Sequence, residues 1–218
     1  SVAILATDSS TTARIADGVV ITGAGDATVS AEGSHKAETK TVGGASGGTA
    51  VTPVVSISVI ENDVLAEIAG TASLSASGAV LVEAKLTADT SADAEGSADG
   101  TKAAVGLALG LSIAEDSAVA RIAGTVSTAG TVAVLSRAIT SSRGSAEASA
   151  TGSKQEGEQT ADTQQQADSQ TATANQRGGT NQQSQNTSTS SGAVTVAAAL
   201  GINVSQTESR AEIAGVDG

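Results

Sequence analysis

The sequence predicts an all-β fold: a repetitive β-solenoid with a period of about 53 residues, from which long β-hairpin excursions extend and stack beside it. Two observations predict it. The motif Ala-x-Ile-Ala-Gly, with Asp-Gly replacing the last glycine in its first copy, starts at positions 13, 66, 120 and 211. Side chains alternate with a period of two before each copy. A fixed spacing of this size indicates stacked supersecondary units.

The motif itself is predicted to be a corner strand with its isoleucine buried. Stacking the copies would align these isoleucines in one structural row, which comprises Ile15, Ile68, Ile122 and Ile213. The preceding residues alternate in charge, as Arg14, Glu67, Arg121 and Glu212. Because opposite charges on neighbouring strands attract, these residues should form a surface charge ladder.

The domain organisation follows from the same spacing, as one continuous array over residues 1–218. The repeats are expected at about 13–65, 66–119 and 120–210, with 211–218 starting the next. A polar insertion at about 154–191 explains the greater length of the third repeat. Since the chain begins and ends inside a repeat, we expect it to be a piece of a longer array.

The apolar run before each motif indicates a β-strand. In the second such run, Val105, Leu107 and Leu109 alternate with Ala or Gly, a period of two that a helix would not produce. A turn is expected after each run, at residues 61–63, 115–117 and 206–208. Asn, Asp and Ser favour turns because their side chains bind nearby backbone groups.

Long segments with few large apolar residues separate the repeats. Residues 87–104 alternate small and polar side chains, which indicates a strand with a thin buried face. Glycines near residues 43–48, 99–100 and 178–179 supply the positive φ of tight hairpin turns. Each repeat is therefore expected to extend a β-hairpin, and successive hairpins to stack into a fin.

Residues 154–191 are rich in Gln, Ser, Thr and Asn, and two interpretations stay open. The segment either buries too little apolar surface to become ordered, or forms a longer hairpin stabilised by amide ladders.

Composition excludes several classes of function. The formal net charge is −12, so the chain should repel phosphate backbones and anionic membrane surfaces. No apolar run approaches the roughly 18 residues of a spanning helix, so this segment is not expected to insert into a membrane. The chain contains no Cys, which excludes disulfides, and no aromatic residue. The expected partners therefore do not include nucleic acid.

Candidate chemistry is sparse, and we predict no catalytic residue, no cofactor and no enzyme activity. The single histidine, His35, is interpreted as a solvated strand residue. Paired carboxylates lack the aromatic side chains that usually line hydrolytic clefts. The weak calcium candidates are oxygen ligands on one predicted strand face and at the expected turns. They are Asp89, Asp93 and Asp99, followed by Asp63 and Asp116.

The repeat Val-x-Ile-x-Val-Ile-Glu-Asn-Asp-x-x-Ala-Glu-Ile-Ala-Gly at residues 55–70 resembles the repeat regions of giant bacterial surface adhesins. These are the filamentous-haemagglutinin-like adhesins and large autotransporter passengers. The resemblance covers the chain except residues 154–191. It implies an exported, rod-like β-solenoid at the bacterial cell surface.

We therefore expect a non-enzymatic structural stalk segment of an extracellular bacterial adhesin or fibre. Its partners would be a host or neighbouring-cell surface, or a second copy pairing edge to edge. Two alternatives remain: a self-assembling extracellular filament subunit, and an acidic module that binds a cation or a glycan.

Overall fold

The computed structural model describes residues 1–152, 187–189 and 194–214, and this part of the chain is all-β. Six strands form one sheet in the order β1-β3-β5-β7-β8, with β9 also paired to β5; β2, β4 and β6 form a second, small sheet. All pairings are parallel. The strands are β1 (Val2–Ile15), β2 (Val20–Ala24), β3 (Ala27–Ile68), β4 (Ser73–Ala76), β5 (Val80–Ile122), β6 (Thr125–Thr128), β7 (Val132–Gly152), β8 (Thr187–Thr189) and β9 (Thr195–Ile213).

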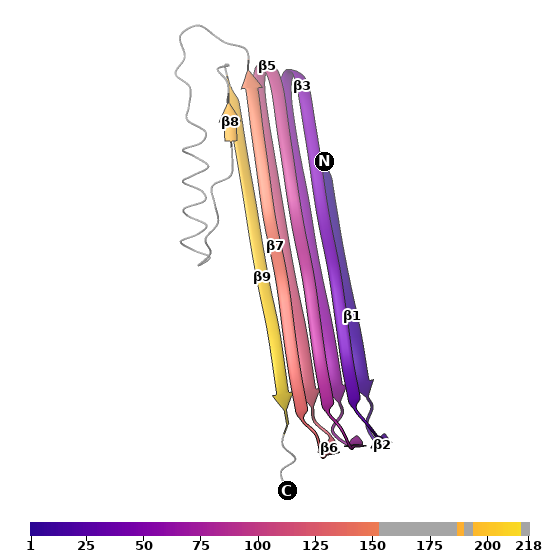
Figure 1. Ribbon diagram of the computed structural model, residues 1–218. Helices are drawn as coiled ribbons and strands as arrows, with labels where there is room; N and C mark the ends of the chain where they lie inside the picture. The colour runs from indigo at the N-terminus through magenta and orange to yellow at the C-terminus, as the bar shows by residue number, and fades with distance from the viewer. Residues whose placement is uncertain (153–186, 190–193, 215–218) are drawn as a thin grey trace.

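The longest strands, β3 and β5, run from the small sheet to a distant tip and then return (Figure 1). The register between them shifts at Gly47, whose φ of 149° favours glycine, and pairing resumes at Thr49 opposite Ala103. We call residues 27–47, 80–100 and β7 the ascending wall. Residues 49–68 and 103–122, together with β1 and β9, are the descending wall.

The β-hairpins expected from the sequence are therefore wrong. Within the described residues, the two arms of β3 or β5 form no antiparallel ladder; each arm pairs in parallel with an arm of another long strand. The arms instead lie face to face: Ser56 Oγ donates to the Thr39 carbonyl at 3.0 Å and Thr52 Oγ1 to that of Ser97 at 2.7 Å. No separate fin exists in this part of the chain, because the polar segment and the apolar run form opposite walls.

The expected turns at residues 61–63, 115–117 and 206–208 are also wrong, since these residues lie inside β3, β5 and β9. Parallel pairing on both sides already satisfies the backbone groups of residues 61–63 and 115–117. The inward side chain of Asn62 then bonds its neighbour in the ladder, Asp116, instead of its own backbone.

Small side chains fill the space between the walls. Ala104, Gly106, Ala108 and Gly110 point inward, whereas Leu107 and its large neighbours point outward. A Cβ atom at Gly110 would collide with the Ser145 carbonyl oxygen of the opposite wall. The walls are therefore too close for leucine over much of their length.

Two apolar clusters lie within this space. The cluster near the tip consists almost wholly of alanine, with Val54 as its one larger buried residue. The cluster near the small sheet is aliphatic and includes Ile68, Leu74 and Leu86, each at most 1% exposed. Side chains of the small sheet, such as Leu74 and Ala76, form part of this cluster.

The four motif isoleucines share one register position. Ile15 of β1 pairs with Ile68 of β3, Ile68 with Ile122 of β5, and Ile122 with Ile213 of β9. Burial is not uniform along this row. Ile68 and Ile122 are buried, but Ile213, on the outer strand β9, is 64% exposed.

The two interpretations of residues 154–191 fall almost wholly outside the described residues. Only Thr187–Thr189 of that segment is described, and it pairs with residues 148–150 as β8.

Close packing of the walls predicts that a larger residue at an inward glycine destabilises the fold. Gly110→Ala should lower the free energy of unfolding by about 1–3 kcal/mol, because the walls must separate around the new methyl group. Urea denaturation measures this change. Gly48→Ala is the matched control, since its Cβ would meet nothing within 4 Å, and its effect should stay below about 1 kcal/mol. Equal effects of the two substitutions would contradict the close approach.

Candidate functional site

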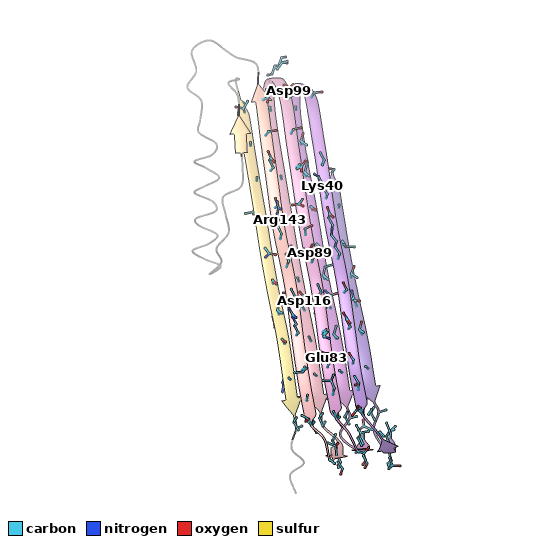
Figure 2. All side chains as sticks on the ribbon, in the orientation of Figure 1. Lys40, Glu83, Asp89, Asp99, Asp116 and Arg143 are labelled. Atoms are coloured by element: carbon cyan, nitrogen blue, oxygen red, sulfur yellow. The ribbon has the colours of Figure 1, made fainter. Side chains whose placement is uncertain are left out.

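The carboxylates proposed as calcium ligands on β5 lie on the outer face of the ascending wall, where cations pair with Asp93 and with the neighbouring Glu95. Asp89 lies opposite Lys36 in the ladder. Lys40 Nζ is 2.8 Å from Glu95, and the hydrogen bond from Lys40 to Glu95 raises the pKa of the lysine. Asp93 Oδ1 lies 3.7 Å from Arg143 Nη2. Figure 2 shows Asp89 and Asp99 far apart along the wall.

The second candidate pair, Asp63 and Asp116, does not share a repeat position. Asp63 pairs with Ser117 and is exposed, whereas Asp116 pairs with Asn62 and is 4% exposed between the walls. Asn62 Nδ2 donates to Asp116 Oδ1 at 2.7 Å. In the part of the chain that the structure describes, no three His, Asp or Glu side chains gather as metal ligands would.

His35 points between the walls and is half-buried, so its interpretation as a solvated residue is wrong. The register explains its position, because His35 aligns with the inward residues Ala88 and Thr140. Its Nδ1 lies 3.4 Å from Ser9 Oγ. Among the described contacts of His35 there is no carboxylate to orient the ring, so the geometry is not that of a Ser-His-Asp triad.

His35 belongs to a polar layer that crosses the interior. The descending wall supplies Ser9, Asn62, Asp116 and Thr207 from one register row. Thr140 Oγ1, on the ascending wall, lies 2.7 Å from Thr207 Oγ1. Because these groups bind one another across and along the walls, the layer fixes the register of the two walls.

The charge ladder of the corner motif forms continuous ion pairs. Glu67 has a side chain only 4% exposed and contacts two cations: Arg14 Nε at 2.7 Å, and Arg121. Arg121 Nε also lies 3.9 Å from Glu212. The hydrogen bond from Arg121 to Glu67 raises the arginine pKa, against a smaller lowering by desolvation. The sequence indicates the alternating signs, but not that the two arginines bury the carboxylate between them.

Two further aspartates connect successive repeats at the corners, and sequence reasoning missed both. Asp17 Oδ1 accepts hydrogen bonds from Thr71 N at 3.1 Å and Thr71 Oγ1 at 3.0 Å, and Asp26 Oδ1 accepts one from Ala79 N at 2.7 Å. The hydrogen bonds from Thr71, chiefly that from its backbone, lower the pKa of Asp17. The signal was available, since Asp17 lies 54 residues before Thr71, at the repeat spacing.

The outer face of the descending wall is apolar over five rows, and we call it the outer apolar face. Each row runs across neighbouring strands in register. The rows are Val51, Val105 and Val196; Pro53, Leu107 and Ala198; Val2, Val55, Leu109 and Leu200; Ile4, Ile57, Leu111 and Ile202; and Ala6, Val59, Ile113 and Val204. Seven of these side chains are large hydrophobics 38–67% exposed.

Comparisons with protein-family models, with curated proteins and with solved structures find no match to this chain. The described residues include no helix with the length and hydropathy to cross a bilayer.

The buried carboxylate of the charge ladder should carry a measurable share of stability. Glu67→Gln should lower the free energy of unfolding by about 2 kcal/mol, because Arg14 and Arg121 then lose a shared, desolvated anion. Urea denaturation tests it. Glu208→Gln, at an ion pair of 3.9 Å with 53% exposure, is the control and should change stability by less than about 1 kcal/mol. A Glu67→Gln effect no larger than the control would refute the burial argument.

The corner contact of Asp17 predicts an acid-dependent stability. Because its pKa is lower in the folded chain, the ionised group stabilises the fold above its ordinary pKa of 3.8, and this contribution is lost as pH falls through the lowered value. Asp17→Asn should therefore reduce the Tm at pH 7. The difference from the unaltered chain should shrink as the pH falls below 3.8, and a difference independent of pH would contradict the assignment.

Proposed function

We propose that this chain is a non-enzymatic structural stalk segment of an extracellular bacterial adhesin or fibre, built as a β-solenoid with coils of about 53 residues. The single observation that carries the proposal is the in-register ladder between β3 and β5. It continues from Ala27 opposite Val80 to Ile68 opposite Ile122, with one shift at the tip. A repeat stacked in this way extends the molecule without requiring a new core.

Contacts between repeats support a mechanical role. Hydrogen bonds of parallel ladders lie between neighbouring repeats, so separating two repeats breaks all of them. The charge ladder through Glu67 and the corner contact of Asp17 also join one repeat to the next. Stability in such an array is close to a sum of repeat and interface contributions.

The resemblance of residues 55–70 to adhesin repeats supports the extracellular location and an adhesive context. In this proposal the stalk holds adhesive regions away from the cell, and it touches a host or neighbouring-cell surface through them. The proposal requires no cofactor. The neutralised outer carboxylates of β5 give no support to the alternative of a dedicated calcium module.

A self-assembling filament subunit is the second candidate function, and one observation favours it. The outer apolar face exposes rows of aliphatic side chains on a regular lattice, which is a surface suited to lateral contact between chains.

Pulling the chain from its two ends by atomic force microscopy tests the stalk. Coils should unfold one after another, because the interactions lie between neighbours. A coil of 53 residues should release about 180 Å of contour length, at the reach of an extended chain. The longer interval between Ile122 and Ile213, about 91 residues, should release about 310 Å. One event that releases the whole chain at once would refute independent, stacked coils.

A further inference from the structure

The outer apolar face is large enough to be an interface. The five rows, spaced by two residues, extend about 27 Å along the strands. The four strands β1, β3, β5 and β9 extend about 14 Å across. With the width of the side chains, the face covers about 550 Å², so two copies would bury roughly 1,100 Å² together. This passes the size of about 1,000 Å² that a specific interface requires.

The shape of the face selects a second copy of this chain as its partner. Its rows are about 6.6 Å apart along the strands, and its strands are about 4.8 Å apart. The parallel ladder sets both spacings. A surface with the same two spacings can pack against it row on row over its whole length. Figure 1 shows the long strands side by side with little twist, which keeps the face flat.

The opposite outer face does not compete for this role. The ascending wall presents charged rows, such as Lys40 with Asp93 and Glu95 with Glu147. At the positions of the outer apolar face there is no charged side chain. Only the descending wall can therefore pair without desolvating ions.

Charges at the two ends of the outer apolar face determine the orientation of the pair. Toward the small sheet, the next outward row contains Asp8, Glu61 and Glu115, with no cation among them. Toward the tip lies the exposed Lys102. In a parallel pair the acidic rows of the two copies would face and repel each other. In an antiparallel pair Glu115 lies opposite residue 103 of the other copy, beside Lys102.

We propose that two copies of this chain associate face to face and antiparallel through their outer apolar faces, on a two-fold axis through the row of Leu109. The contact is isologous, so each copy contributes the same residues. This pairing goes beyond the proposed stalk, because it joins two stalks along their sides.

Sedimentation velocity of the full chain tests the association. The unaltered chain should be dimeric at micromolar concentration. Leu111→Lys should be monomeric with an unchanged far-UV spectrum, because Leu111 is partly exposed on the outer face and its side chain does not enter the interior. Thr87→Lys is the matched control: it lies on the same strand and faces outward on the ascending wall, so it should remain dimeric. A monomer of the unaltered chain at all concentrations, or a dimer of Leu111→Lys, would overturn the proposal.

Cysteine crosslinking tests the orientation, and the chain has no cysteine of its own. Under mild oxidation, Leu109→Cys should form a dimer on the axis. Val105→Cys alone should not, whereas a mixture of Val105→Cys and Ile113→Cys should crosslink. Efficient crosslinking of Val105→Cys to itself would overturn the antiparallel arrangement.

The alternative partner for the outer apolar face is a lipid surface. Co-sedimentation of the chain with neutral phosphatidylcholine vesicles distinguishes it. Vesicle binding that Leu111→Lys abolishes, in a chain that is monomeric in solution, would assign the face to lipid and overturn the proposal. Dimers that do not bind the vesicles would support it.

Discussion

The in-register parallel ladder is the constraint on which the rest of the structure depends. It places each residue about 4.8 Å from its partner on the neighbouring strand, so every row must consist of side chains that tolerate one another at that distance. Apolar and small residues satisfy this condition because each packs against a similar residue on the neighbouring strand. The buried charge of Glu67 satisfies it by alternation in sign with Arg14 and Arg121. Rows of a single sign, such as Asp8, Glu61 and Glu115, lie on the outer face, where solvent screens their repulsion. The ladder therefore restricts which residue types can occupy each row.

The second constraint is the narrow space between the walls. Inward glycines such as Gly106 and Gly144 approach carbonyl oxygens of the opposite wall, so the interior holds little besides Ala, Gly, Ser and Thr over much of its length. Alanine contributes little buried area per residue, but it loses no side-chain entropy on folding. The polar layer adds contacts between the walls, Ser9 with His35 and Thr140 with Thr207, that specify one alignment of the walls. These hydrogen bonds specify how the walls pack, which the small apolar side chains of the interior would not do alone.

Much of this fold could be predicted from the sequence, because register follows from spacing. The copies of Ala-x-Ile-Ala-Gly predict the pairing of Ile15, Ile68 and Ile122 from their positions alone. The arrangement of the arms could not be predicted in the same way. A glycine-rich turn between two strands, as at Gly47, suits both an antiparallel hairpin and two arms in separate layers. Only the partners of the backbone groups distinguish them, and those partners lie in the neighbouring repeats, far away in the sequence.

The candidate site residues show a related limit. Asp63 and Asp116 end similar runs and so look equivalent in the sequence, yet a shift of one residue places the first outside and the second inside. In a strand, such a shift exchanges the faces completely. The same ambiguity concealed the outer apolar face, since alternation of Leu with Ala or Gly does not state which set is buried. Gly106 and Gly110 decide it: a wall that requires glycine must turn that face toward another backbone. The leucines, on the other face, then remain available to a partner.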